Sequence, residues 1–207
     1  MKKLTLFLTF ALIASYGFSQ ISTTAHDLST YAFTDEICIV CHTPHNAGST
    51  DAPLWDRTAT SATFTVYSSN TIDANSGTIP APSNESKLCL SCHDGTVELE
   101  AFGSSTATTS TYITTTNGDL LGTDLRDDHP VSMTYNSALI TDDPGLVDPT
   151  TAGSGITGTI EEDMLFGTAG SKTVECASCH DVHDNTNGKF LLISNSGSAL
   201  CLKCHDK

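Results

Sequence analysis

Four copies of one short pattern, C-x-x-C-H, constrain the fold of this chain more than any other feature. They stand at Cys38–His42, Cys89–His93, Cys176–His180 and Cys201–His205. Together they use all eight cysteines of the 207 residues, so no cysteine remains for another purpose. The residues between the copies are rich in Ser, Thr, Gly, Asn and Asp, and the usual core-forming side chains are sparse. Whatever the four copies hold must therefore supply much of the hydrophobic core.

Three kinds of chemistry use paired cysteines at this spacing. An exported chain with an even cysteine count can form disulfides, and C-x-x-C pairs also bind zinc or iron–sulfur clusters. In neither case must the residue after the second cysteine be histidine, yet it is histidine in all four copies. C-x-x-C-H is the attachment pattern of c-type haem, in which both thiols form thioethers with the porphyrin and the histidine binds the iron. The sequence therefore predicts four covalent haems, called haem 1 to haem 4 in chain order, attached through Cys38, Cys41, Cys89, Cys92, Cys176, Cys179, Cys201 and Cys204.

The histidine count indicates how the irons are coordinated. Four of the eight histidines belong to the motifs and are the expected proximal ligands: His42, His93, His180 and His205. The remaining four match the number of distal ligands that four irons need: His26, His45, His129 and His183. We therefore expect every haem to be six-coordinate with two histidine ligands. Its reduction potential should be low, because no methionine ligand raises it.

An iron with two protein ligands has no open position for a substrate. A haem that activates a small molecule needs such a position, as metal enzymes do. No catalytic triad or phosphate-binding loop stands out in the sequence either. The sequence thus predicts a protein that moves electrons and is not an enzyme.

The first 19 residues have the organisation of a secretory signal peptide. Lys2 and Lys3 are followed by the apolar run Leu4–Ala14 and by Gly17-Phe18-Ser19. The apolar run is too short for a permanent membrane anchor, and no later segment is long and apolar enough to cross a bilayer. We expect cleavage after Ser19, export, and a soluble protein. The formal net charge of −15 disfavours binding to nucleic acid or anionic lipid and suits cationic partners.

The second half of the chain repeats the order of motifs in the first half. Each half has H-x-(apolar)-S, then C-x-x-C-H-x-x-H, then L-C-L-x-C-H-D, beginning at His26 and at His129. Two dihaem modules are the simplest account, and repeats of this kind usually stack. We therefore divide the chain into a signal peptide (1–19), a first module (20–103) and a second module (104–207) that starts with a Thr-rich insertion.

Between the motifs the sequence favours loops. Ala62–Ser68 alternates like a short strand, and Thr111–Leu121, with its Asn117-Gly118 turn, is typical of a β-hairpin. Helix is expected only as single turns around the C-x-x-C-H motifs. The predicted fold is therefore mostly irregular, with short helices and a few hairpins, and with two dihaem modules wrapped around a stacked row of haems.

Several stretches resemble the tetrahaem extracellular cytochromes of metal-reducing bacteria. They are "CIVCHTPHNA", "APLWD", "KLCLSCHDGT", "DHPVS", "VECASCHDVH" and "SALCLKCHDK", and they span nearly all of the chain after the signal peptide. The resemblance implies stacked bis-histidine haems and polymerisation of identical subunits into a conductive head-to-tail filament. It also implies a histidine near the N-terminus that binds a haem of the neighbouring subunit, and His26 occupies that position.

Two interpretations of function follow from these observations. The leading one is extracellular electron transfer along such a filament, to redox partner proteins or extracellular electron acceptors. The alternative is a monomeric periplasmic tetrahaem shuttle with the same haems and no polymer.

Spacing suggests which distal histidine serves which haem. His45 and His183 each lie three residues after a proximal histidine, too close to reach the far side of their own haem, so we expect them on haem 2 and haem 4. His26 and His129 would then serve the first haem of each module. Either each stays in its own module, or His129 reaches back to haem 1 and His26 to haem 3 of the preceding subunit. The duplication allows both schemes, and the resemblance favours the second, which builds an open filament.

Overall fold

A computed structural model describes most of the chain after the predicted signal peptide. The described residues are 21–48, 52–103, 110–116 and 119–206. The predicted signal peptide, the Asn117-Gly118 turn and the first part of the Thr-rich insertion lie outside these ranges.

Regular structure is short and widely spaced in the described residues, as the sequence predicted. The α-helices are α2 (Asn84–His93), α3 (Ser137–Asp142), α4 (Ile160–Asp163) and α5 (Cys201–Cys204). The 3-10 helices are η1 (Leu28–Thr30), η2 (Ala74–Gly77), η3 (Cys176–Ser178) and η4 (Ser196–Ser198). The strands are β1 (Thr65–Val66), β2 (Asp124–Leu125), β3 (Met133–Thr134) and β4 (Thr173–Val174). The protein is thus mostly loop, with a few short helices and two small sheets.

The strand pairs join distant segments and are not the predicted hairpins. β1 pairs in parallel with β2, and β3 pairs antiparallel with β4. The predicted strand over Ala62–Ser68 is reduced to the two residues of β1. The described parts of the predicted Thr111–Leu121 hairpin form no ladder, because their backbone groups bond elsewhere. The Thr111 carbonyl accepts from the Leu99 N–H (2.8 Å), and the Leu121 N–H donates to the His93 carbonyl (2.8 Å).

Helix α2 is longer than the single turn expected around a motif. It begins at Asn84, five residues before Cys89, and it carries the whole second motif at its C-terminal end. Leu88 and Leu90 are buried along it, and Glu85 in the first turn complements the positive end of the helix dipole. Leu88 and the buried Ser86 precede the motif, so their burial gives the helix a tertiary reason to extend beyond it.

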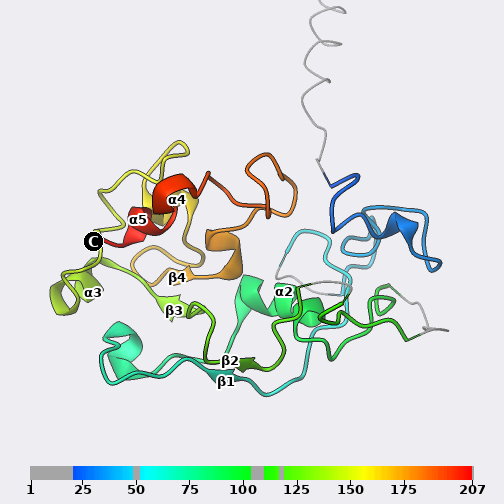
Figure 1. Ribbon diagram of the computed structural model, residues 1–207, viewed down its shortest axis with the longest axis horizontal. Helices are drawn as coiled ribbons and strands as arrows, with labels where there is room; N and C mark the ends of the chain where they lie inside the picture. The colour runs from blue at the N-terminus through cyan, green and yellow to red at the C-terminus, as the bar shows by residue number, and fades with distance from the viewer. Residues whose placement is uncertain (1–20, 49–51, 104–109, 117–118, 207) are drawn as a thin grey trace, which may run out of the picture.

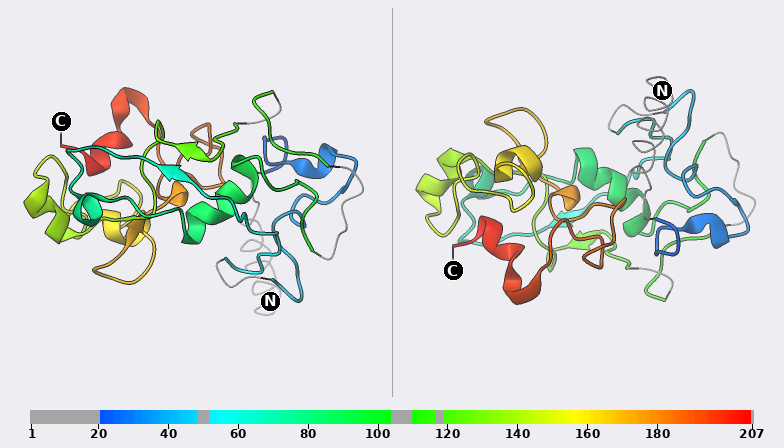
Figure 2. Two further views of the ribbon diagram at one scale, coloured as in Figure 1. Left: turned by 90° about the horizontal axis from the view of Figure 1, so that it is seen from below. Right: turned by 90° about the horizontal axis from the view of Figure 1, so that it is seen from above.

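The described chain is elongated, and α2 lies near its middle (Figure 1). Residues 21–48 occupy one end in all views, whereas α3 and α4 occupy the other (Figure 2). α2 packs against η3, so the second and third motifs are neighbours in space. The motifs therefore run along the length of the molecule.

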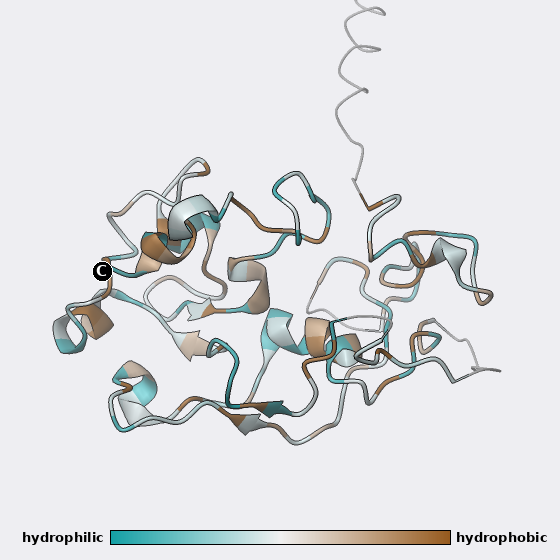
Figure 3. Ribbon diagram, in the orientation of Figure 1, coloured by the Kyte–Doolittle hydropathy of each residue, from teal (hydrophilic) through white to brown (hydrophobic). Residues whose placement is uncertain are grey.

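One hydrophobic cluster of buried residues lies mainly in the second half of the chain. It consists of Ala74, Ile79, Tyr135, Leu139, Ile160, Met164, Leu165, Val174 and Leu200. Two of these residues come from the first half, so the cluster crosses the predicted module boundary, which stays a prediction. Elsewhere hydrophobic residues are scattered in short stretches along the loops (Figure 3). In the described ranges, no helix combines the length and the apolar character that crossing a bilayer requires.

Candidate haem-attachment sites

Three of the four motifs fold back on themselves in the same way. After Cys38–His42, the Thr43 N–H donates to the Leu54 carbonyl (2.9 Å) and the Asp56 N–H to the Cys41 carbonyl (3.0 Å). After the third motif, the Asp181 N–H donates to Phe190 (2.7 Å) and the Leu192 N–H to Cys179 (2.9 Å). After the fourth, the Asp206 N–H donates to Gly145 (2.9 Å) and the Val147 N–H to Cys204 (2.9 Å). Each arrangement forms an antiparallel bridge at the motif histidine.

The first and third motifs match in backbone conformation as well. Leu54 and Phe190 occupy the same place in this turn, and both have φ of 57°. Side chains other than glycine rarely adopt this left-handed region. The same unusual conformation at equivalent places supports the duplication inferred from the motif order.

Backbone carbonyls orient three of the motif histidines. Nδ1 of His42 lies 2.7 Å from the Pro53 carbonyl oxygen, and Nδ1 of His93 lies 2.7 Å from that of Asp119. Nδ1 of His180 lies 2.9 Å from the Lys189 carbonyl oxygen. A carbonyl oxygen accepts a hydrogen bond from Nδ1–H, so Nε2 is left with its lone pair. This is the arrangement that metal-binding histidines use to fix their tautomer and ring orientation.

Two of the other histidines have an acceptor at Nδ1 too. Nδ1 of His129 lies 2.9 Å from the Pro130 carbonyl oxygen. Nδ1 of His183 lies 3.5 Å from the Asp181 carboxylate. Both rings therefore also leave Nε2 free to bind a metal.

All eight cysteines are free thiols. Burial raises the pKa of Cys41 to about 11 and that of Cys204 to about 11. A hydrogen bond between the Cys89 and Cys176 thiols raises the pKa of Cys89 and lowers that of Cys176 to about 7. This contact brings a thiol of the second motif against one of the third. Among the described residues, no three His, Cys, Asp or Glu side chains are arranged to hold a metal ion.

Three pairs of histidine rings face each other across the molecule. The ring centroids of His42 and His183 are 6.1 Å apart, with an interplanar angle of 24°. Those of His26 and His93 are 6.1 Å apart at 83°, and those of His129 and His205 are 6.3 Å apart at 72°. Each pair joins one motif histidine to one histidine outside the five-residue motifs.

These separations fit two imidazoles on opposite sides of one iron. An imidazole nitrogen binds a transition metal at roughly 2 Å, so the centroids of two such trans rings lie roughly 6 Å apart. All three observed pairs agree with this spacing although the rings come from distant parts of the sequence. These six histidines therefore have the spacing expected of paired haem ligands.

The observed pairs differ from the pairing predicted from spacing. His183 lies against His42 of the first motif and not against the fourth. His129 lies against His205, whereas both predicted schemes placed it on a first haem of a module. His93 is faced by His26, not by His45. The prediction assumed that the two motifs of one module are the closest neighbours, but the fold brings motifs of different modules together.

His26 is held within its own chain in this structure. Its ring stacks on Phe190, with centroids 4.6 Å apart, in addition to facing His93. Burial lowers the pKa of His26 to about 4, and repulsion from His93 and two further histidines adds to this effect. Nδ1 is buried and has no hydrogen-bond partner among the described residues. The predicted exchange of His26 between subunits stays a prediction. In this single chain the ring lies against Phe190 and His93.

His45 and His180 are the two histidines outside these pairs. Both are exposed. No second histidine ring stands against His180 in the described ranges, and the side chain of His45 has no hydrogen-bond or ring partner there. One motif histidine and one distal candidate are therefore left without a partner histidine ring in the described residues.

The residues that orient the motif histidines were not found from the sequence. The carbonyl groups of Pro53, Asp119 and Lys189 belong to loop residues, and any residue type supplies a carbonyl. Among these three residues, Pro53 lies in the "APLWD" stretch near the first motif, which belongs to the resemblance described above.

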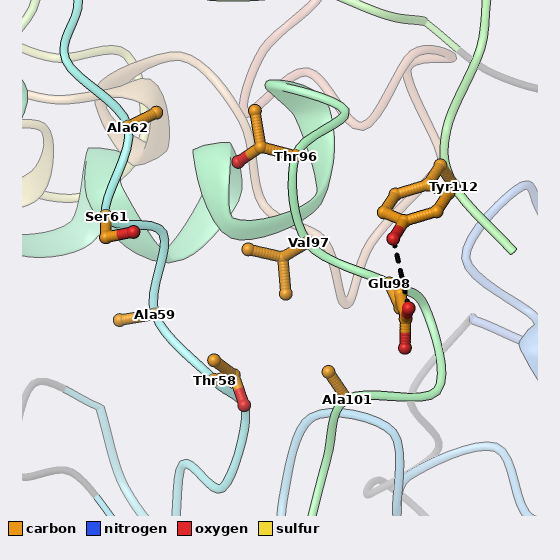
Figure 4. A pocket seen from close by; sticks show the side chains of 9 residues that line it. All are labelled: Thr58, Ala59, Ser61, Ala62, Thr96, Val97, Glu98, Ala101 and Tyr112. Carbon is orange, nitrogen blue, oxygen red and sulfur yellow. Dashed lines mark hydrogen bonds between the residues drawn. The ribbon is translucent and has the colours of Figure 1, made fainter. Parts of the chain in front are cut away.

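A shallow pocket of about 400 Å³ lies apart from the histidine pairs. Tyr112 closes one side by donating to the Glu98 carboxylate at 3.0 Å (Figure 4). The other residues that line the pocket are Thr58, Ala59, Ser61, Ala62, Thr96, Val97 and Ala101. Its lining contains no histidine or cysteine. The pocket is therefore not the place where the motifs meet.

Comparison with known proteins identifies the motif type. A family model described as the doubled CXXCH motif matches residues 169–207, which contain the third and fourth motifs. No curated protein matches the chain. The doubled motif indicates a multihaem c-type cytochrome with covalently bound haem and a role in electron transfer.

Proposed function

We propose that this protein carries four bis-histidine haems and transfers electrons along them outside the cell, as a filament of identical subunits. The observation that most directly supports bis-histidine haems is the spacing of the three histidine pairs, whereas the filament rests on the resemblance described above. In each pair the two rings leave room for one iron between them and none for a substrate. When bound, the haems supply reversible one-electron chemistry. The chain attaches them, orients their ligands and excludes water around them.

The three pairs assign the ligands of three haems. His42 and His183 would hold haem 1, and His93 and His26 would hold haem 2. His205 and His129 would hold haem 4. Haem 1 then takes its distal ligand from the segment that attaches haem 3, so the two modules share ligands.

Haem 3 has His180 as its proximal ligand, and His45 is the histidine left to complete it. The duplication makes this assignment consistent, because His45 and His183 occupy equivalent places after the first and third motifs. His183 serves the first haem of the other module, so by the same rule His45 serves haem 3. The side chains of His45 and His180 are both exposed in the single chain, as expected for two ligands that come together only when a second subunit binds.

We therefore assign the exchanged ligand to His45 instead of His26. A contact from His45 of one subunit to haem 3 of the next is heterologous, and it builds an open filament because each subunit has one donor and one acceptor end. The second candidate function is the monomeric shuttle, in which His45 closes on haem 3 of its own chain. It has the same ligands and differs only in where that bond forms.

The haem content is tested first on the purified protein. Intact mass should exceed that of the polypeptide by four haems, and the visible spectrum should show low-spin haem only. Rapid binding of carbon monoxide or cyanide by the assembled wild-type protein would contradict full histidine ligation.

Assembly is tested by comparing His45→Ala with His26→Ala. We expect His45→Ala to give separate subunits with one high-spin haem, and His26→Ala to give filaments that also contain one high-spin haem. Electron microscopy and the spectrum read out both properties. Filaments of His45→Ala with every haem low-spin would exclude His45 as the exchanged ligand. A wild-type protein that stays monomeric and low-spin would support the shuttle.

A further inference from the structure

Two deeply buried side chains of opposite charge lie beside the cysteine motifs. Arg57 is 6% exposed and Glu175 is 1% exposed. Charged side chains are seldom buried to this extent without a charged partner. Neither residue belongs to a motif or to the ligand set proposed above.

The guanidinium group of Arg57 joins the first motif to the chain that follows the second. Nη1 donates to the carbonyl oxygens of Val40 (3.1 Å) and Leu99 (2.9 Å), and Nη2 donates to that of Glu98 (2.9 Å). Val40 lies between the two cysteines that attach haem 1. All three acceptors are neutral, and Nε has no hydrogen-bond partner among the described residues. The positive charge is thus fixed beside haem 1 by groups that do not neutralise it.

The field of Arg57 reaches thiols of two motifs. The positive charge of Arg57 interacts with the side chains of both Cys41 and Cys92. Near Cys92 the buried carboxylate of Asp94 acts in the other direction. Haem 2 therefore lies near charges of both signs, whereas Arg57 is the buried charge placed directly at the first motif.

The carboxylate of Glu175 lies at the junction of the second and third motifs. Its Oε2 accepts from the Ser86 hydroxyl, from the Ser86 N–H (3.4 Å) and from the Ser132 hydroxyl (3.0 Å). Its Oε1 accepts from the Thr173 hydroxyl (2.6 Å). Ser86 belongs to α2, and Glu175 directly precedes Cys176, which attaches haem 3.

The hydroxyl groups around Glu175 are placed to donate to its carboxylate. The Ser86 hydroxyl already accepts from the Cys176 N–H (3.0 Å), and the Ser132 hydroxyl accepts from the Ser83 N–H (2.9 Å). Each serine therefore has its one hydroxyl proton free to donate to the carboxylate. Ser132 and Thr173 each have a backbone carbonyl within reach as well, at 3.5 Å and 3.4 Å, but the Glu175 carboxylate is the nearer acceptor for both. The negative charge is fixed beside haem 3.

We propose that these two residues set the reduction potentials of neighbouring haems in opposite directions, Arg57 raising that of haem 1 and Glu175 lowering that of haem 3. A fixed positive charge favours the arrival of an electron nearby, and a fixed negative charge disfavours it. Both effects are large because water does not screen buried charges. This inference rests on the haems of the proposed function. It adds a built-in difference in potential between haems that have identical ligand types.

The chain offers matched controls for both charges. Arg126 is the other arginine of the sequence, with its side chain 65% exposed, and Asp184 is an exposed carboxylate shortly after the third motif. The test compares Arg57→Gln with Arg126→Gln, and Glu175→Gln with Asp184→Asn. Arg57→Lys and Glu175→Asp keep the charge and report on packing alone. Each haem-loaded protein is titrated with reductant at known potential while its visible spectrum is recorded.

We expect Glu175→Gln to shift part of the titration curve to higher potential and Arg57→Gln to shift part of it to lower potential. The two exposed variants and the two charge-conserving variants should stay close to wild type. Shifts of the same sign for both buried variants, or shifts no larger than those of the controls, would overturn the proposal. If Arg57→Gln does not fold, the comparison of Glu175→Gln with Asp184→Asn still tests whether Glu175 lowers the reduction potential of haem 3.

Intact mass and the low-spin spectrum, recorded on the same samples, keep this test separate from that of the proposed function. Four low-spin haems with unshifted potentials would refute the role of the buried charges and leave the ligand assignment intact. Fewer haems, or a high-spin fraction in wild type, would instead contradict the proposed function.

Discussion

At the scale of single residues, polar groups of the loops hold the motif residues in place through hydrogen bonds. Three motif histidines have carbonyl acceptors at Pro53, Asp119 and Lys189, which lie 11, 26 and 9 residues away along the chain. Tyr135 makes a comparable contact near the fourth motif. It is 2% exposed, and its hydroxyl donates to the carbonyl oxygens of Val147 and Cys204.

Replacement of Tyr135 by phenylalanine tests this contact. The Val147 carbonyl would lose a donor in a buried place, so we expect a loss of about 1–2 kcal/mol in the free energy of unfolding. Haem content should not change, because no ligand is removed. Thermal and denaturant unfolding of haem-loaded protein measure the effect, with Tyr112→Phe as the control at the edge of the shallow pocket. Equal stabilities of the two variants would argue against the buried hydrogen bonds.

At the scale of elements, the acidic cluster Glu161-Glu162-Asp163 is part of a helix start. Thr159 and Glu162 form a capping box at the N-terminus of α4. The Asp163 carboxylate accepts from the N–H groups of Thr157 (3.0 Å) and Gly158 (2.7 Å) and from the Ser154 hydroxyl (2.5 Å). These hydrogen bonds lower the pKa of Asp163 from 3.8 to about 2. The carboxylate therefore ties the preceding loop to α4.

The stabilising effect of Asp163 should depend on pH. Its pKa is lower in the folded state, so its contribution is fully present above the ordinary value of 3.8 and is lost as the pH falls through about 2. We expect Asp163→Asn to melt at a lower temperature than wild type at pH 7, with a difference that shrinks steadily between pH 4 and pH 2. Asp142→Asn, at an exposed position, serves as the control. A difference independent of pH would show that the charge is not involved.

At the scale of the whole molecule, the hydrophobic core is unevenly distributed. The cluster of buried residues and the partly buried side chains packed on it begin at Val66 and lie mainly after Met133. Residues 21–48 contribute Val40 to the buried hydrophobic residues of the described chain, and Val40 is outside that cluster. Residues 21–48 must therefore depend more on bound haem for burial of apolar surface than residues 133–204 do.

Protein made without haem attachment should reveal this imbalance. We expect limited proteolysis of the haem-free chain to cut within residues 21–60 well before residues 133–204, because the second region keeps a cluster of its own. Haem-loaded protein should resist cleavage in both regions. Mass spectrometry of the early fragments identifies the sites. First cuts spread evenly over both regions would contradict the uneven core.

Attachment of the haems follows from the amino-acid sequence alone. Two thiols and a histidine within five residues are enough to hold one haem, so the four motifs could be found without a structure, and the loop-rich fold class could be inferred from what lies between them. The distal ligands were predicted as a set by count, whereas count alone does not give their pairing. The ring of His183 meets that of His42, and Glu175 meets Ser86 across 89 residues of sequence. Such contacts depend on the path of the whole chain, because no short-range pattern encodes which distant segments a loop-rich fold brings together.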